Sequence, residues 1–355
     1  MQVALGHRVV IAVGSVGVFS STLARAGIDF RDLGWSERYV GISQAAPWGS
    51  VLAGLPDIAR AARELRRLVR SLRPDVVQAH TRKAQLVASL ALADIDIPLV
   101  WHLRDGLPAR APLRALIGHA LRRADHAVAL SQWLAQSYVE SGAVPRSGRI
   151  GVVPSGVDGR RLAQLPTPWL SGERRPVIGY VGQIARWKGP HLLIEAAEHL
   201  DDPELTFRLI GGVWFPGEEA YGRSVRRRLQ RSPAARRVEW RPTTEHPEHA
   251  FEQIDVLAHT SLAPEPFGRV LVEAMIARRP IIALNSGSAS ELLDEQTAVF
   301  ADRPDGPAIA AAVSALINDR ESARLLVERA AGRATRFSPS AVGALMDSEY
   351  ALMGR

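Results

Sequence analysis

The chain has 355 residues, of which 46% are hydrophobic and 23% charged, and its formal net charge is +7. This length exceeds the usual size of a single hydrophobic core, so we expect two domains. The absence of cysteine excludes disulfides, thiolate nucleophiles and cysteine metal sites, and the absence of an apolar run of about 18 residues predicts no membrane-spanning helix.

Short apolar segments alternate with amphipathic helical segments through the first half of the chain. This alternation is typical of βαβ units and predicts a parallel sheet. The strands are expected at Val9–Val13, Asp75–Ala79, Leu99–His102, Ala127–Ser131 and Ile150–Val153, with helices at Asp57–Leu72, Lys83–Ala93, Leu113–Arg123 and Gln132–Ser141.

A stretch rich in proline and charge, residues 165–176, has no periodicity, and we interpret it as an interdomain linker. The alternation then starts again. Strands are expected at Val177–Val181, Thr206–Ile210, Val238–Trp240, Val256–Ala258, Pro280–Ala283 and Ala298–Phe300, and helices at Pro190–Leu200, Glu218–Gln230, Arg269–Ala277, Pro307–Asn318 and Arg320–Thr335.

The first motif runs from Gly179 to Pro190 with the sequence GYVGQIARWKGP. It predicts a strand, a loop with two cations and a helix that begins near the proline. Gly182 lets the backbone approach a ligand closely, and Arg186 and Lys188 add positive charge to a helix N-terminus that already favours anions. The motif indicates a diphosphate site; the alternative is a strand–loop–helix with surface cations. It is not a Walker loop, because the spacing differs.

The second motif, PEPFGRVLVEAM, begins at Pro264 and separates Glu265 from Glu273 by seven residues. With Glu265 in a loop and Glu273 in the following helix, one carboxylate can meet sugar hydroxyls and the other ribose hydroxyls, since each accepts several hydrogen bonds. The backbone near Gly268–Val270 would offer N–H groups to phosphate. The alternative places Glu273 on a solvated helix face.

Together the motifs resemble the GT4-type family of retaining GT-B glycosyltransferases, whose hallmarks are a Glu-x7-Glu element in the context EPFG…EAM and a G-x-(I/V)-x-x-x-K-G loop. The resemblance covers nearly the whole chain and is most specific in the C-terminal half. It implies an α/β, GT-B fold of two Rossmann-like, doubly wound domains that face across a cleft. Residues 1–165 would form the acceptor-side domain and residues 166–337 the donor-binding domain. The helix in 338–355, apolar on one side from Ser338 to Leu352, would pack back on the first domain.

The resemblance also implies site residues. Arg186 and Lys188 would neutralise the donor diphosphate, Glu265 would face the donor sugar, and Glu273 would bind the ribose. The segment 287–291, GSASE, is similar to the family's Gly-Gly-(I/V)-Pro-Glu turn, with Ser290 in place of proline. The remaining donor-binding residues implied in this way are Gly182, Phe267, Gly268, Arg269 and Val270.

The first half of the chain resembles the family less closely. WHLRD, residues 101–105, resembles an H-x-R-D strand end, which would put His102 over the active centre against the donor sugar, as a catalytic residue. His80 ends another strand in a region similar to H-x-H-(S/T)-x-K-A, with Gln78 at the first histidine position, and implies an acceptor-side role. A structural role at a strand end is the alternative for either histidine.

One departure from the family lies at the start of the chain. Members begin with a strand and a glycine-rich loop that feeds a first helix ending in GHxV, whereas here GHRV stands at residues 6–9. The absent strand is central in the family, between the strands that correspond to Val9–Val13 and Asp75–Ala79. We therefore expect a form extended upstream by roughly 20 to 30 residues, a length estimated from one strand, loop and helix, to be more stable and more active.

The implied reaction is transfer of a sugar, as a hexosyltransferase would perform it, from a nucleoside-diphosphate sugar to a glycan, lipid-linked or small-molecule acceptor. No cofactor or metal site is expected, because Arg186 and Lys188 can take the charge role of Mg²⁺. One alternative is a catalytically silent binding subunit of the same fold, which the missing loop supports. Another is a sugar-nucleotide epimerase, which the complete Glu-x7-Glu element argues against.

The basic charge is spread over helical patterns, and no nucleic-acid module is recognisable, so no nucleic-acid partner is expected. Basic charge also permits contact with an anionic membrane surface. We expect a cytoplasmic protein, free or peripheral at a membrane, that works in carbohydrate biosynthesis.

Overall fold

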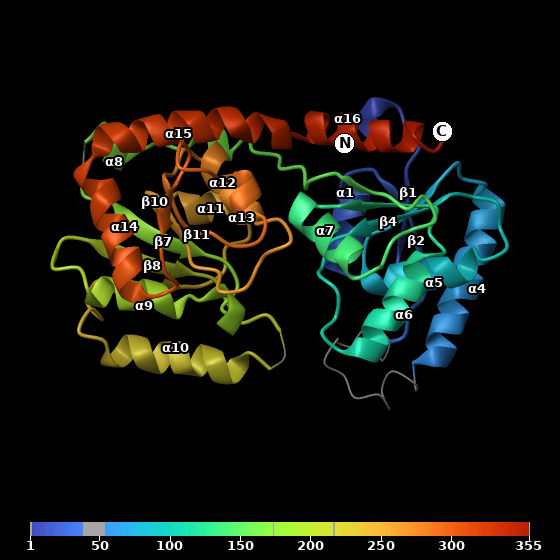
Figure 1. Ribbon diagram of the computed structural model, residues 1–355, viewed down its shortest axis with the longest axis horizontal. Coiled ribbons are helices and arrows are strands. Elements are labelled where there is room, and N and C mark those ends of the chain that lie inside the picture. The colour runs from blue at the N-terminus through green and yellow to red at the C-terminus, as the bar shows by residue number, and fades with distance from the viewer. Residues whose placement is uncertain (1, 38–53, 173, 216, 355) are drawn as a thin grey trace. The chain divides into compact units, whose positions relative to one another are not determined.

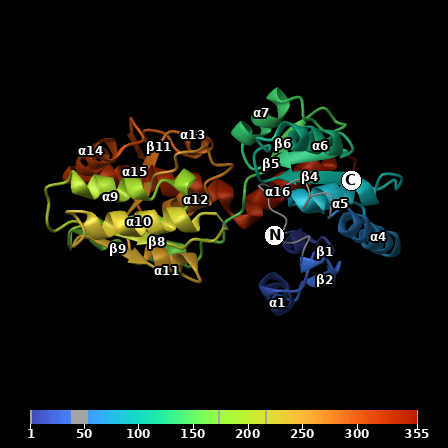
Figure 2. The same cartoon turned by 90° about the horizontal axis from the view of Figure 1, so that it is seen from below.

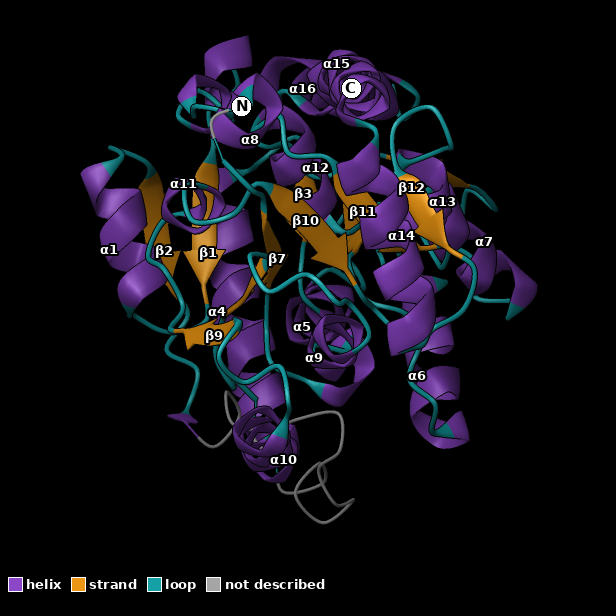
Figure 3. Ribbon diagram, turned by 90° about the vertical axis from the view of Figure 1, so that its left-hand side faces the viewer, coloured by secondary structure: helices purple, strands orange, loops and turns teal. Residues whose placement is uncertain are grey.

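The computed structural model describes residues 2–37, 54–172, 174–215 and 217–354, which form two α/β units (Figures 1 and 3). Unit 1 comprises Met1–Pro154 and Val342–Arg355, and unit 2 comprises Ser155–Ala341. The contacts thus divide the chain after residue 154, whereas the sequence pattern places the division after residue 165. Across the described ranges, no helix combines the length and apolarity that a membrane span requires.

The strands of unit 1 belong to two parallel sheets. In the described part of the unit, one sheet pairs only β1 with β2, and the larger sheet has the order β3-β4-β5-β6; Figure 2 shows β1, β2 and α1 to one side of the group β4–β6. The sequence pattern does not predict β2, because its residues, DFRD, are mostly charged and exposed. The bounds are β1 Val10–Val13, β2 Asp29–Asp32, β3 Val77–Ala79, β4 Leu99–Leu103, β5 His126–Ala129 and β6 Ile150–Val152.

The helices of unit 1 begin and end at recognisable signals. Thr81 and Ser131 are N-caps whose hydroxyls accept hydrogen bonds from the backbone N–H groups of Ala84 and Leu134. The helix bounds are α1 Val18–Arg25, α4 Leu55–Leu72, α5 Arg82–Ala91, α6 Ala111–Leu121, α7 Gln132–Glu140 and α16 Pro339–Ala351, with a 3-10 turn at Gln2–Leu5.

The C-terminal helix α16 covers one face of the larger sheet of unit 1. Because side chains alternate along a strand, Val100 and Val128 share one face, and there they pack with Val342 and Met346 of α16 in one apolar cluster. Trp101, on the opposite face, donates a hydrogen bond from its indole nitrogen to Ser89 Oγ of α5 at 3.2 Å. The helices between the strands therefore cover one face, and α16 covers the other.

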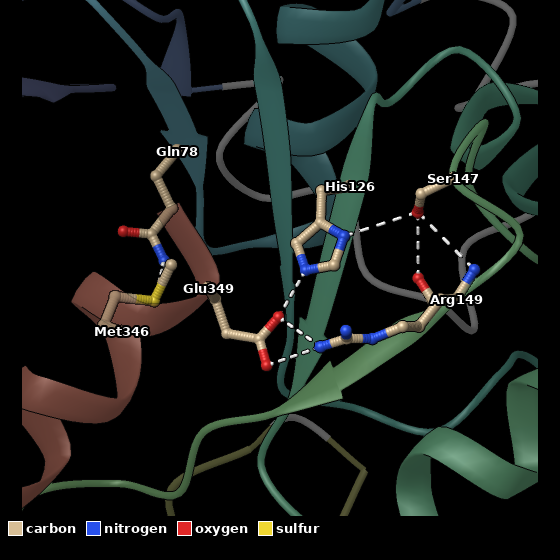
Figure 4. Close-up of polar contacts among 6 residues, drawn as sticks. All are labelled: Gln78, His126, Ser147, Arg149, Met346 and Glu349. Carbon is tan, nitrogen blue, oxygen red and sulfur yellow. Dashed lines mark hydrogen bonds and ion pairs between the residues drawn. The ribbon is translucent and has the colours of Figure 1, made fainter. Parts of the chain in front are cut away.

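A polar cluster holds α16 against the sheet near the C-terminal end of the helix (Figure 4). The carboxylate of Glu349 lies 2.7 Å from His126 Nε2 on β5 and accepts two hydrogen bonds from Arg149 Nη2, at 2.8 and 2.9 Å. A Cβ on Gly151 of β6 would lie 2.4 Å from this carboxylate, so glycine provides the space that Glu349 occupies. At the other strand edge, Gln78 contacts Met346 Sδ at 3.5 Å.

Unit 2 is a doubly wound domain with one parallel sheet of order β12-β11-β10-β7-β8-β9. The order reverses between β7 and β10, and right-handed connections then put helices on both faces. The strands are β7 Val177–Val181, β8 Thr206–Ile210, β9 Val238–Arg241, β10 Val256–His259, β11 Ile281–Leu284 and β12 Val299–Ala301. The helices are α8 Pro168–Ser171, α9 His191–Glu198, α10 Glu219–Arg231, α11 Pro247–Phe251, α12 Arg269–Ile276, α13 Ala289–Leu292, α14 Gly306–Asn318 and α15 Arg320–Ala334.

The proline-rich stretch 165–176 is more ordered than the linker expected from its composition; its Glu173 lies outside the described residues. It contains the short helix α8, whose Trp169 is 1% exposed and belongs to the core of unit 2 with Leu170. Arg324 of α15 donates two hydrogen bonds to the carbonyl of Leu170. The linker interpretation is wrong for this part, because one buried tryptophan anchors a segment that has no periodicity.

Candidate functional site

The motifs of unit 2 meet where its strand order reverses. Strand β7 leads into the loop with Arg186 and Lys188, and the adjacent strand β10 leads into the loop with Glu265. Carboxyl ends of parallel strands lie at the same edge of a sheet, and a reversal of strand order leaves a crevice there that ligands commonly occupy. The fold thus brings together two motifs that are separated by about 80 residues of sequence.

Several glycines allow the backbone segments at this edge of the sheet to approach one another closely. Gly211, after β8, has φ +156°, and a Cβ there would lie 1.8 Å from the carbonyl oxygen of Gly182, whose own φ is +155°. Gly189 has φ +63°, and its Cβ would lie 2.4 Å from the carbonyl oxygen of Thr260. The close backbone approach at these positions explains why side chains are absent there.

Lys188 and Glu265 form an ion pair at this edge of the sheet. Lys188 Nζ lies 2.6 Å from Glu265 Oε2, and the two side chains are 16% and 8% exposed. Lys188 also lies over the ring of Trp187, with Nζ 4.6 Å from the ring centroid. Lys188 and Lys83 are the two lysines of the chain, against 42 arginines.

The second oxygen of Glu265 is held from β10. His259 Nε2 lies 2.8 Å from Glu265 Oε1, and the Ser261 hydroxyl donates a hydrogen bond to the same oxygen. Burial opposes ionisation of Glu265, but His259 and Lys188 outweigh it and hold the pKa of the carboxyl well below its usual range. The carboxylate is therefore fixed in position and stays charged at neutral pH. Sequence reasoning missed His259 and Ser261; their position at the end of a buried strand was the available signal.

The side chain of Arg186 contacts other residues than that of Lys188 does. Its guanidinium carbon lies 5.1 Å from the ring centroid of Tyr221 on α10, and its backbone N–H donates to Glu218 Oε2 at 3.1 Å. Tyr221 is held in turn by a 2.7 Å hydrogen bond between its hydroxyl and His191 Nδ1. Arg186 is exposed, whereas the Lys188 side chain is largely buried.

The helix after the second loop carries the other glutamate. Gly268, at φ +74°, is the N-cap of α12, and Phe267 before it is buried against the ring of Phe337 at a centroid distance of 5.7 Å. Arg269 donates to Glu273 Oε1 at 2.8 Å. Glu273 is 8% exposed, and its pKa is raised because burial outweighs the attraction of Arg269. Val270, the third residue of the expected backbone cradle, lies in the first turn of α12.

The turn at residues 287–291 contacts the loop of Glu265 directly. Gly287 has φ +58°, and a Cβ there would lie 2.7 Å from the backbone nitrogen of Glu265. The backbone N–H of Ser288 donates to the Glu265 carbonyl at 3.2 Å, and the Ser288 hydroxyl is buried with no hydrogen-bond partner among the described residues. Ser290 hydrogen-bonds the Gly287 carbonyl at 2.8 Å, which closes the turn without the family's proline.

His102, the candidate from the first half of the chain, lies in unit 1 on β4 and is 7% exposed. Its Nδ1 lies 3.4 Å from Gln78 Nε2, and its Nε2 is buried and has no partner in the part of the chain that the structure describes. Burial, with smaller contributions from His80 and Arg104, lowers the pKa of His102 to about 3. The ring is therefore neutral at physiological pH.

Residues that could hold a metal do not gather in either unit: within the described ranges, no three His, Asp or Glu side chains form such a group.

Family models match both halves of the chain. Residues 2–161 match the model described as Glycosyltransferase Family 4, and residues 164–333 match that described as Glycosyl transferases group 1. A D-inositol 3-phosphate glycosyltransferase of Corynebacterium urealyticum is 30% identical over 215 residues, which is 56% of this chain and 50% of that protein. A glycogen synthase of Mycobacterium tuberculosis is 30% identical over 295 residues, 75% of this chain and 66% of that protein.

Solved structures share the fold. The Anabaena protein Alr3699/HepE, crystallised with UDP and glucose, matches with a TM-score of 0.80 at 24% identity, over 99% of this chain and 94% of that one. A sucrose-phosphate synthase of Thermosynechococcus elongatus matches with a TM-score of 0.80 at 18% identity, over 99% and 90%. The chain spans about half the length of the curated relatives that match it first.

Proposed function

Because the chain belongs to the GT4-type family of glycosyltransferases and has their GT-B fold, we propose that it transfers a sugar from a nucleoside-diphosphate sugar to an acceptor. In this proposal the configuration at the anomeric carbon is retained, unit 2 binds the donor, and unit 1 binds the acceptor. The observation that carries the proposal is the buried ion pair of Lys188 with Glu265 at the switch point of unit 2.

Lys188 and Arg186 suit a diphosphate leaving group. Cleavage of the sugar–phosphate bond increases the negative charge on the diphosphate, and fixed cations beside it stabilise that charge where it develops. Lys188 is paired with Glu265 in the ligand-free chain. A bound diphosphate would share this lysine, and Arg186 would turn from Tyr221 to add a second cation. No metal is required for this charge balance.

Glu265 suits the donor sugar. Its Oε1 is fixed by His259 and Ser261, so the carboxylate can accept sugar hydroxyl hydrogen bonds without first being ordered. Because its pKa is low, it acts as an acceptor of hydrogen bonds and not as an acid. His102 of unit 1, which is neutral, is proposed to complete the sugar contacts.

Glu273 suits the ribose, since it is buried one turn into α12 beside the N-terminus that would receive the phosphates. The proposed donor base is uracil, because the Anabaena protein of the same fold was crystallised with UDP and with UDP-glucose. The proton of the acceptor hydroxyl would pass to a leaving phosphate oxygen on the same face of the sugar, since the Glu265 carboxylate is engaged by His259 and Lys188. The role in the cell would be carbohydrate biosynthesis.

Calorimetric titration of the full chain with UDP, GDP, ADP and dTDP tests the donor site. UDP should bind with one site per chain, and Lys188→Ala should weaken it by tenfold or more, because one of two cations is lost. Arg227→Gln is the matched control, since Arg227 is an exposed cation on α10 of the same unit. Absence of binding by all four nucleotides, or equal affinity of the Lys188→Ala variant, would reject the proposal.

A further inference from the structure

The end of strand β10 carries three consecutive polar residues, His259, Thr260 and Ser261, directly after its apolar run. All three side chains are buried. A buried polar group is costly unless it makes hydrogen bonds, so the partners of these residues indicate what the residues do. Two of them contact Glu265, and the third contacts the loop of Lys188.

His259 and Ser261 hold one oxygen of Glu265 and leave the other to a ligand. His259 Nε2 lies 2.8 Å from Oε1 of the carboxylate, and the Ser261 hydroxyl donates a hydrogen bond to the same oxygen. Ser261 Oγ also lies 3.4 Å from His259 Nε2, so the three side chains form a closed triangle. A carboxylate oxygen accepts about two hydrogen bonds, so Oε1 is fully engaged within the protein. Oε2 lies 2.6 Å from Lys188 Nζ.

The same strand end holds the loop that carries Lys188. The Thr260 hydroxyl donates to the carbonyl of Lys188 at 3.0 Å, and the backbone N–H of Leu262 donates to the Trp187 carbonyl at 2.8 Å. The lysine and the glutamate are thus both placed by the segment 259–262. The direction of the Glu265 carboxylate decides where Oε2 lies relative to the lysine.

The sheet, rather than a loop, fixes the direction of the His259 ring. His259 lies opposite Ala283 of β11 in the parallel register, both residues are buried, and a strand places a side chain more precisely than a loop does. The Nδ1 atom of His259 is buried and has no hydrogen-bond partner among the residues that the structure describes. A leucine here would avoid an unpaired nitrogen, so the contacts of Nε2 are what distinguish the histidine from an apolar residue.

We propose that His259 is a positioning residue for the donor sugar: it commits Oε1 of Glu265 to the protein, so that Oε2 faces the sugar hydroxyls beside the lysine that receives the diphosphate. This role rests on the proposed function and deepens it, because it names a residue on which recognition of the sugar depends. Without His259 the carboxylate gains rotational freedom that a bound sugar must remove again. The loss should fall chiefly on the sugar, since the proposed diphosphate and ribose contacts come from Lys188, Arg186 and Glu273.

The test is calorimetric titration of the full chain with UDP and with UDP-glucose, UDP-galactose, UDP-N-acetylglucosamine and UDP-glucuronate. For the UDP-sugar that binds the parent most tightly, His259→Leu should weaken binding by roughly tenfold or more, as expected for a lost hydrogen bond to a charged group. UDP itself should change by less than about threefold, a difference below the ~1.4 kcal/mol of a tenfold change. His259→Gln, whose amide also donates a hydrogen bond, should restore most of the UDP-sugar affinity.

Two further variants complete the experiment. Ser261→Ala removes one donor to Oε1 and keeps His259, so it should weaken the UDP-sugar by a smaller factor than His259→Leu does. His199→Leu is the matched control, because His199 is an exposed histidine at the C-cap of α9 in the same unit, and it should change neither affinity.

A positioning role and the donor site itself fail in different ways. If His259→Leu weakens UDP and the UDP-sugar equally, or if His259→Gln is as weak as His259→Leu, the positioning role is wrong and the donor site stands. UDP binding without binding of any of the four UDP-sugars would also overturn the positioning role. If the parent does not bind UDP, the proposed function fails and the role of His259 fails with it.

Discussion

Replacing Glu349 by alanine should destabilise unit 1 by about 2–3 kcal/mol, because this carboxylate joins α16 to the sheet. It contacts His126 Nε2 at 2.7 Å and Arg149 Nη2 at 2.8 and 2.9 Å. The His126 and Glu349 side chains are 4% and 12% exposed, so this contact resembles a buried hydrogen bond to a charged group, worth ~1.5–3 kcal/mol. Arg149 is 51% exposed, and its share should lie within the ~0–1 kcal/mol of surface pairs.

The assay is urea denaturation of the full chain, with amide hydrogen exchange at β5 and β6 as the local readout. Asp347→Ala is the matched control on the same helix, because Asp347 pairs with His7 and is 36% exposed. We expect the control to lose less than about 1 kcal/mol. The reasoning would be refuted by a Glu349→Ala variant within about 0.5 kcal/mol of the parent, the range of ordinary surface substitutions, or by equal losses in both variants.

The remaining predictions concern the site. Glu273→Ala should weaken UDP binding, whereas Glu265→Ala should chiefly weaken transfer; equal loss of UDP affinity in both variants would contradict the division of ribose and sugar roles. Gly287→Ala should lower the unfolding free energy by at least about 1 kcal/mol and reduce transfer, since its φ is positive and its Cβ would displace the Glu265 backbone; unchanged melting and activity would refute this. His102 has a pKa of about 3 when folded against about 6.5 unfolded, so its protonation favours the unfolded chain as pH falls below 6.5. Between pH 6.5 and 5 the unfolding free energy of the parent should therefore fall by up to ~2 kcal/mol more than that of His102→Gln, measured by denaturation at each pH. Identical pH profiles of the unfolding free energy in the two proteins would contradict a buried, neutral His102.

The sequence pattern predicted the sheet of unit 2 closely. The expected strands Val177–Val181 and Thr206–Ile210 agree with β7 and β8 at both ends, because both are short β-rich runs between helical segments. The family and the GT-B fold are confirmed by the comparisons. The roles of the site residues stay predictions.

Contacts through space could not be read from the pattern. His259 holds Glu265 only because the loop after β10 folds back on its own strand end. Gly151 is a glycine because Glu349, about 200 positions later, needs the volume of its side chain. Strand β2 was missed because its charged residues have no apolar alternation.

The most direct test of the donor site uses the two lysines, Lys83 in unit 1 and Lys188 in unit 2. The full chain is treated with an amine-reactive ester, with and without saturating UDP, and the modification of each lysine is measured by mass spectrometry. We predict that UDP protects Lys188, because the diphosphate covers its Nζ, and leaves Lys83 unchanged as an internal control. Bound UDP that leaves Lys188 as reactive as before, or that protects Lys83 in its place, would contradict a donor site built on Lys188 and Glu265.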